Sequence, residues 1–168
     1  MLIKLIRNQP KGSGITGRLV INGRWFCNTL ERVDYQILAL CYSVRVTHSP
    51  KFKRLLPIVQ NVPRSMSKVE REKLKVNEIS KAVSTDSQHS TFNIQHTAMR
   101  SGIRFHRGSK PEHSTGCILV PADKEKALTD LILNAQNAHE EIILEVIDYS
   151  PGTEYGYNTP CPRELQKR

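Results

Sequence analysis

Short apolar runs, several of them alternating with polar residues, cover most of the chain, and this pattern is typical of β-strands. Residues 2–7 and 18–27 are the first two runs, and they are separated by a Gly-rich turn. The second run contains Asn22-Gly23, a strong hairpin signal, flanked by apolar residues on both sides. The sequence therefore predicts a β-meander at the start of the chain.

A third apolar region covers residues 36–48, and its second half, YSVRVT, alternates as a half-exposed strand does. Ser49-Pro50 ends this strand, and residues 51–63 are short and rich in turn formers. We expect further strands at 102–106, 117–120 and 142–147.

A single packed helix is expected to begin at Pro121, since proline suits the first helical turn and acidic residues follow it. Ala127, Leu128, Leu131 and Ile132 keep the helical period. The fold class predicted is thus mainly β with one packed helix (α+β), in a single domain over residues 1–149.

Two segments differ in composition from this domain. Residues 64–101 are charged and then polar, and we interpret them as an insertion between core strands. The insertion is a candidate for a surface helix and loop, with a lid, a partner-binding element and a solvated decoration as alternatives. Residues 150–168 are rich in proline and glycine and are predicted to form an extended C-terminal tail.

The 168 residues carry a formal charge of +9, which favours polyanions such as nucleic acid, anionic lipid or an acidic cell-wall polymer. Aromatic residues make up only 6% and do not alternate with Lys or Arg, which argues against nucleic acid. No apolar run approaches the roughly 20 residues of a membrane span. The first residues do not form a signal peptide. We therefore expect synthesis in the cytoplasm and delivery to the cell wall by a phage or a secretion system.

The four cysteines form no C-x-x-C pair, and no His, Cys and Asp spacing indicates a metal, so no metal or cofactor is expected. Cys27 and Cys41 lie in strand-like runs and are predicted to be small buried hydrophobes.

Cys117 differs, because it follows His106 by eleven residues across a polar loop. A nearby histidine or cation lowers the pKa of a thiol, so His106, Arg107 and Lys110 are expected to favour the thiolate. Gly116 would allow close approach to a substrate carbonyl, and backbone N–H groups near it are candidates for an oxyanion hole. Ser114 either donates a hydrogen bond in the site or forms the turn.

The string Ser114-Thr115-Gly116-Cys117-Ile118, with His106-Arg107-Gly108 upstream, resembles the L,D-transpeptidase (YkuD-like) signature. More of the chain resembles the DUF5675 family of phage and bacterial proteins. The segments that carry this wider resemblance are Cys27-Asn28-Thr29-Leu30-Glu31, Ser49-Pro50-Lys51-Phe52, Leu56-Pro57, Asn61-Val62-Pro63, Gly102 to His106 and Gly116 to Val120.

The resemblance implies a YkuD-like β-sandwich or barrel and a cysteine enzyme acting on peptidoglycan stem peptides. Thr115 and Leu119 depart from the signature, which has histidine and arginine there. The base is therefore His106, with His113 as the alternative. Candidates for the contact with a substrate carboxylate are Arg104, Arg107 and Lys110.

Two other functions compete with this one. The chain could be a binding or structural module of a phage particle or secretion apparatus with a vestigial cysteine. It could also bind nucleic acid through its basic surface. Glu31 could orient a basic residue, but an ordinary surface position is expected for it.

Overall fold

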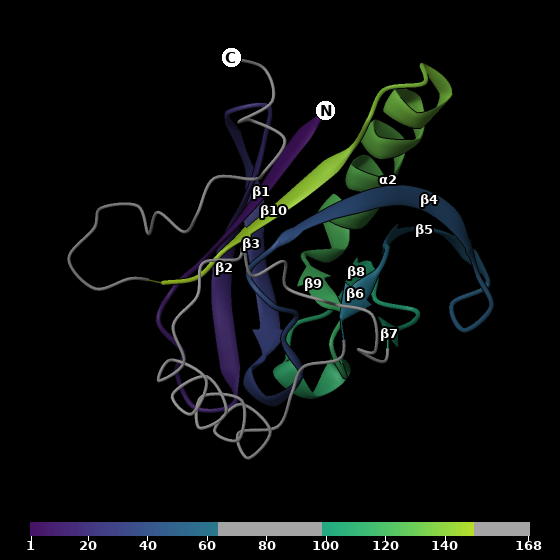
Figure 1. Cartoon of the computed structure of the whole chain (residues 1–168). Helices are drawn as coiled ribbons and strands as arrows, with labels where there is room; N and C mark the ends of the chain where they lie inside the picture. Colours follow the sequence, from purple (N-terminus) through teal and green to yellow (C-terminus); the bar gives the residue numbers. More distant parts are fainter. Residues whose placement is uncertain (64–98, 150–168) are drawn as a thin grey trace, which may run out of the picture.

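The computed structural model describes residues 1–63 and 99–149, and strands dominate this part of the chain (Figure 1). The strands of the first part are β1 (Leu2–Arg7), β2 (Gly14–Ile21), β3 (Arg24–Arg32), β4 (Cys41–Ser49), β5 (Arg54–Val59) and β6 (Val62–Pro63). The second part holds β7 (Met99–Arg100), β8 (Phe105–Arg107), β9 (Ile118–Val120), the helix α2 (Ala122–Asn137) and β10 (Ile143–Ile147). Short 3₁₀ turns cover Val33–Tyr35 and Pro111–His113.

Eight of the strands form one sheet in the order β5-β4-β10-β1-β2-β3-β9-β8. The pairs β1–β10 and β8–β9 are parallel, and the other pairs are antiparallel. The two edges of the sheet meet, because Ile58 of β5 bridges Arg104 and the Val59 N–H donates to the Ile103 carbonyl at 2.9 Å. The sheet is therefore a nearly closed, barrel-like structure.

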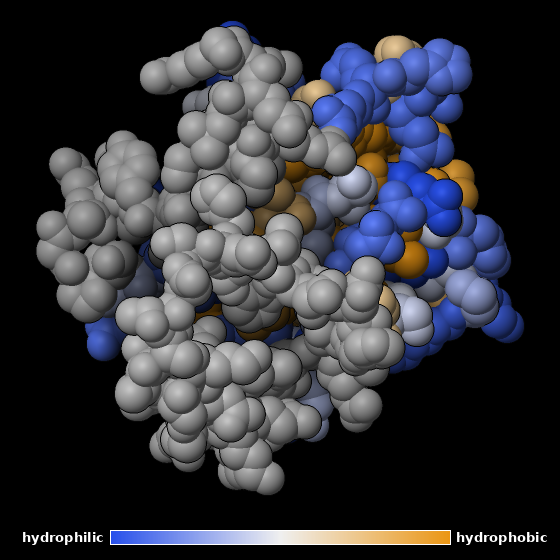
Figure 2. Space-filling model, viewed as in Figure 1, coloured by the Kyte–Doolittle hydropathy of each residue, from blue (hydrophilic) through white to orange (hydrophobic). Residues whose placement is uncertain are grey.

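Helix α2 packs against β4, β5 and β8. Its buried face includes Leu128, Ile132 and Ala135, which join the same core as the inward side chains of the sheet. The outer surface on the side of α2 and the β4–β5 hairpin is mostly hydrophilic, with hydrophobic residues visible between (Figure 2). The protein thus has one core, and the α+β class expected from the sequence is confirmed. None of the described helices combines the length and the apolar character that a membrane crossing needs.

The hairpin at Asn22-Gly23 is confirmed, and both turn residues have the positive φ that such a turn needs, 48° and 81°. The strands on either side are longer than the apolar run at 18–27, because the ladder continues to Gly14 and Arg32. Hydrogen bonding between β2 and β3 extends the pairing into residues whose polar side chains gave no strand signal.

The interpretation of residues 51–63 as turns is wrong for most of that segment. Residues 54–59 form β5, which pairs with β4 over six residue pairs. Pro57 weakened the strand signal, but β5 is an edge strand. On its far side it has only the isolated bridge from Ile58 to Arg104 and the hydrogen bond from Val59 to Ile103, both just before β8. A proline that cannot donate to a ladder is tolerated at such an edge. The region expected at 36–48 is a strand only from Cys41 onward, to Ser49.

Most of the expected insertion at 64–101 lies outside the described residues, as does the tail at 150–168. Its described residues Met99–Arg100 form β7, which pairs antiparallel with β6 just before the insertion, so that Val62 faces Arg100 and Pro63 faces Met99. The segment therefore leaves and rejoins the domain at one place.

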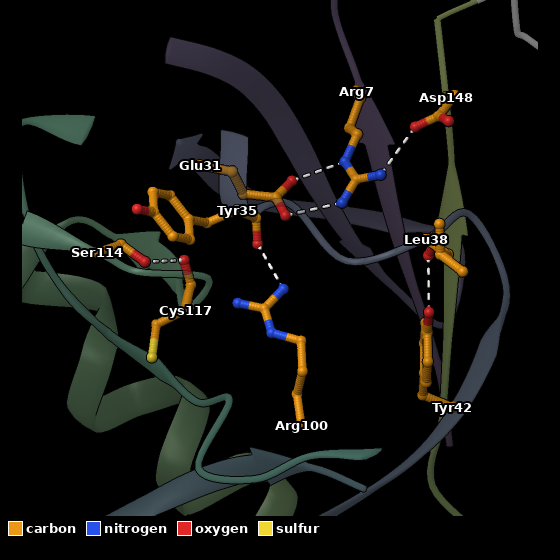
Figure 3. A network of polar contacts seen from close by, with 9 residues as sticks. All are labelled: Arg7, Glu31, Tyr35, Leu38, Tyr42, Arg100, Ser114, Cys117 and Asp148. Atoms are coloured by element: carbon orange, nitrogen blue, oxygen red, sulfur yellow. Dashed lines mark hydrogen bonds and ion pairs between the residues drawn. The ribbon is translucent and has the colours of Figure 1, made fainter. Parts of the chain in front are cut away.

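The expected surface position of Glu31 is wrong. Its side chain is buried and accepts two hydrogen bonds of 2.8 Å from Arg7, whose third nitrogen donates to Asp148 at 2.8 Å (Figure 3). Burial alone would lower the pKa of Arg7, but the bonds to both carboxylates outweigh it and raise that pKa. The network ties β1, β3 and the end of β10 together.

Replacing Glu31 by Gln should lower the free energy of unfolding by about 3–5 kcal/mol, because the Arg7 charge stays buried without its bidentate partner. Urea unfolding measures the change. The double variant Arg7→Met/Glu31→Leu removes both charges and should recover much of the loss. A single variant as stable as the parent would show that the pair does not support the fold.

Candidate active site

Strands β8 and β9 place the two principal candidate residues. These strands run parallel, with Phe105 beside Ile118 and His106 beside Leu119. Phe105 and Ile118 both point into the core. Because side chains alternate along a strand, His106 and Cys117 lie on the opposite face of this pair.

His106 pairs with Leu119, and Cys117 lies two residues before Leu119. The spacing of strands and residues in a sheet puts their Cα atoms about 8 Å apart. The Cys117 thiol contacts the Gly102 carbonyl at 3.7 Å, and the imidazole bonds to a different group. Within the described residues no hydrogen bond joins the two side chains, so the structure brings them to one face without direct contact.

His106 is held in a fixed orientation. The residue is 3% exposed, and its ring packs on Phe52 with ring centroids 4.6 Å apart. Nδ1 lies 2.9 Å from the Arg107 carbonyl, and since a carbonyl can only accept, Nδ1 carries the proton. Nε2 is then the basic nitrogen, and it has no hydrogen-bond partner among residues 1–63 and 99–149. Burial lowers the pKa of His106, with Lys51 and Arg54 acting in the same direction and the Arg107 carbonyl and Glu125 opposing. The imidazole is therefore neutral at pH 7.

The pKa of Cys117 corrects the expectation of a ready thiolate. Burial raises this pKa above its ordinary value, and the Arg104 N–H and three cations lower it only in part. The three cations are Lys51, Arg100 and Arg104. Arg107 and Lys110, which the sequence suggested for this role, are not among them. The resting site is thus a neutral thiol near a neutral imidazole.

The loop before Cys117 is built around Ser114. The Ser114 hydroxyl donates to the Cys117 carbonyl at 2.7 Å (Figure 3). It also accepts from the Gly116 N–H at 3.0 Å. Of the two roles open for Ser114, the structure therefore shows the turn. The Gly116 N–H is already bonded and is not a free oxyanion donor. Cys117 N–H has no hydrogen-bond partner within the described residues, so it remains a candidate donor.

Gly116 is needed for its conformation and for its size. Its φ is 123°, a value that other residues rarely adopt, and an added Cβ would collide with the Arg100 guanidinium. Arg100 itself donates to the Thr115 carbonyl at 2.7 Å and to the Tyr35 carbonyl at 2.8 Å. It thereby ties the loop before Cys117 to the turn after β3 (Figure 3).

Arg104 has a structural role that the sequence did not suggest. Its guanidinium is buried and donates to the Thr47, His48 and Leu56 carbonyls and to the Thr47 hydroxyl, at 2.9–3.2 Å. These bonds join β8 to the β4–β5 hairpin across the seam of the barrel. Four hydrogen bonds to protein groups leave Arg104 poorly placed to grip a substrate carboxylate.

The other predicted contacts with substrate do not gather at the thiol. Arg107, Lys110 and His113 are exposed. The Arg107 N–H donates to Glu125 at 2.6 Å, and His113 Nδ1 accepts from the Ser109 N–H at 3.4 Å. No contact in the described part of the chain connects His113 with Cys117, and His113 lies on the exposed loop and not on β8 beside β9.

Sequence reasoning missed the residues that surround His106 on its other sides. The tip of the β4–β5 hairpin supplies Lys51, Phe52 and Arg54, and α2 supplies Glu125, which pairs with Arg54 at 2.9 Å. The one signal for them was the Ser49-Pro50-Lys51-Phe52 segment within the family resemblance. Nothing in the pattern indicated that this hairpin folds back beside the distant loop.

The other two described cysteines, Cys27 and Cys41, were expected to be buried. Cys27 is buried, and burial raises its pKa to about 11. Cys41 is half-buried. Across residues 1–63 and 99–149, no group of three or more His, Cys, Asp and Glu side chains gathers as a metal site would require.

Comparison with known proteins gives no match. No protein-family model, no curated protein and no solved structure is significantly similar to this chain.

Alkylation of Cys117 by iodoacetamide should rise with pH and reach half its maximum rate above pH 9, since burial raises the thiol pKa from 9.0. Peptide mapping by mass spectrometry after timed labelling separates Cys117 from the other cysteines. A half-maximum near neutral pH would instead show a preformed thiolate and contradict the neutral pair.

Replacing Ser114 by Ala should lower the free energy of unfolding by about 1–3 kcal/mol, because the buried Gly116 N–H and the Cys117 carbonyl lose their partner. Urea unfolding measures this change. Ser109→Ala removes an exposed hydroxyl from the same loop and should be nearly neutral. Equal stability of both variants would argue against the turn as the role of Ser114.

Proposed function

We propose that the protein is a cysteine acyltransferase or peptidase that acts on peptidoglycan stem peptides, with Cys117 as nucleophile and His106 as base. The observation that carries the proposal is the state of His106. It is neutral, its Nδ1 is fixed by the Arg107 carbonyl, and it lies on the same face of β8 and β9 as the thiol. A buried neutral imidazole with a free Nε2 is suited to remove a proton.

In the first step the sulfur of Cys117 bonds to an amide carbonyl carbon of the substrate while the thiol proton passes to His106. The carbonyl oxygen takes the negative charge of the tetrahedral intermediate, and Cys117 N–H is the candidate donor to it. The intermediate then collapses, the C–N bond breaks, and the proton on His106 goes to the leaving amine.

In the second step an amine or a water molecule attacks the thioester. His106 removes a proton from this nucleophile and returns it to the sulfur, so the free thiol is restored. Attack by an amine gives transpeptidation, and attack by water gives trimming of the peptide.

Two further features support this proposal. The barrel-like sheet with one helix is compatible with the YkuD-like fold that the sequence resemblance implies. The formal charge of +9 favours binding to anionic wall polymers. Delivery to the wall by a phage virion or a secretion system belongs to the same proposal.

One observation favours the non-catalytic alternative, a binding or structural module of such an assembly. The pKa of Cys117 is raised, and its thiol contacts a carbonyl instead of the imidazole. A thiol that never ionises in the presence of substrate would be a buried side chain without a catalytic role.

Cys117→Ala should abolish the turnover of purified peptidoglycan fragments, and His106→Gln should slow it by about 10²- to 10⁴-fold. Because burial lowers the pKa of His106 from 6.5, the rate should be full at neutral pH and fall only below pH 6.5. Mass spectrometry of the products measures the turnover, and the mass change separates exchange from hydrolysis.

Cys41→Ala and His48→Gln are the matched controls, since they remove a half-buried thiol and an exposed imidazole elsewhere. Both should keep the parent rate. If Cys117→Ala is folded and still active, the proposal is wrong. If the folded parent leaves every fragment unchanged, the binding-module alternative is favoured.

A further inference from the structure

One cation near His106 has no assigned role. Lys51 lies in the turn between β4 and β5, next to Phe52, and its ammonium is 5.5 Å from the centre of that ring. Phe52 in turn packs on His106. The charge of Lys51 lowers the pKa of His106 and also that of Cys117.

The other cations near these two residues are already engaged. Arg100 donates to the Tyr35 and Thr115 carbonyls, and Arg104 donates to the β4–β5 hairpin. Arg54 pairs with Glu125 through one terminal nitrogen, and its Nε is buried without a partner among the described residues. Lys51 is exposed and forms no ion pair within residues 1–63 and 99–149.

We propose that Lys51 forms a carboxylate-binding subsite beside His106, which selects a peptide carrying a free carboxylate near the amide that Cys117 attacks. This inference rests on the proposed function for its substrate. It assigns the contact that Arg104, Arg107 and Lys110 were expected to make. The exposed ammonium has no hydrogen bond or ion pair in the part of the chain that the structure describes, and a carboxylate is the group of a peptide that it would hold.

The Lys51 charge at the tip of the β4–β5 hairpin would also affect proton transfer to His106. A cation so close to an imidazole opposes its protonation, which keeps His106 neutral before substrate binds. A bound carboxylate would offset the Lys51 charge and make proton transfer to His106 easier. The correct substrate would thereby assist the step that it undergoes.

The subsite can be tested without any peptidoglycan activity by alkylating Cys117 with two small reagents. Iodoacetate is anionic and iodoacetamide is neutral, so the ratio of their rates reports the positive charge at the thiol and cancels the effect of access. The labelling is run at pH 9 so that some of the Cys117 thiol is ionised. The experiment compares the full chain with its Lys51→Gln variant, and peptide mapping measures how much of Cys117 each reagent has labelled.

We expect Lys51→Gln to lower the iodoacetate-to-iodoacetamide ratio about two- to fivefold, the range of a partly exposed ion pair. Lys53→Gln removes the same charge two residues away on the same turn and should leave the ratio unchanged, as should Lys51→Arg. Equal ratios in Lys51→Gln and Lys53→Gln would overturn the proposal. A Cys117 that neither reagent reaches would overturn it as well, because no substrate could then enter.

A second experiment compares the turnover of stem peptides that end in a carboxylate with that of peptides that end in a carboxamide. Lys51→Gln should raise KM for the carboxylate peptide about two- to fivefold and leave the carboxamide peptide unaffected. A changed alkylation ratio without turnover of either peptide would count against the acyltransfer function and in favour of the anion subsite. An equal loss on both peptides would count against carboxylate recognition.

Discussion

The arrangement of the site depends on the hydrogen bonds of the buried Arg104 guanidinium. Its bonds to the Thr47, His48 and Leu56 carbonyls close the seam between the last strand of the sheet and the β4–β5 hairpin. That closure sets the tip of the hairpin, with Phe52 and Lys51, against His106. Burial lowers the pKa of Arg104, and carbonyl dipoles are the partners that make such a buried cation tolerable.

Burial also sets the protonation states that the chemistry starts from. It raises the pKa of Cys117 and lowers that of His106, so both groups are uncharged before substrate arrives. The surrounding cations partly offset the rise in the pKa of Cys117 and add to the fall in the pKa of His106. Such a site avoids the cost of keeping an ion pair in a region of low dielectric. It requires the proton transfer and the attack on the carbonyl to be coupled.

Much of the fold follows from local pattern, whereas the site follows from contacts between distant segments. Asn22-Gly23 and the period of α2 specify a hairpin and a helix by themselves. The strand β5 was missed because Pro57 is acceptable only at an edge, which is a property of the sheet. Cys117 and His106 carried a motif, but the positions of Lys51, Arg100 and Glu125 depend on the closure of the barrel. The burial of Glu31 depends on Arg7, which is distant in sequence.

The most direct test of the central claim is the intact mass of the protein after brief incubation with purified stem peptides followed by acid quenching. Acid preserves a thioester, so the account predicts an added mass equal to the acyl part of the peptide, mapped to Cys117. The leaving amine should appear in equal amount. Release of that amine with no adduct on Cys117, or an adduct that forms equally well in Cys117→Ala, would contradict the account.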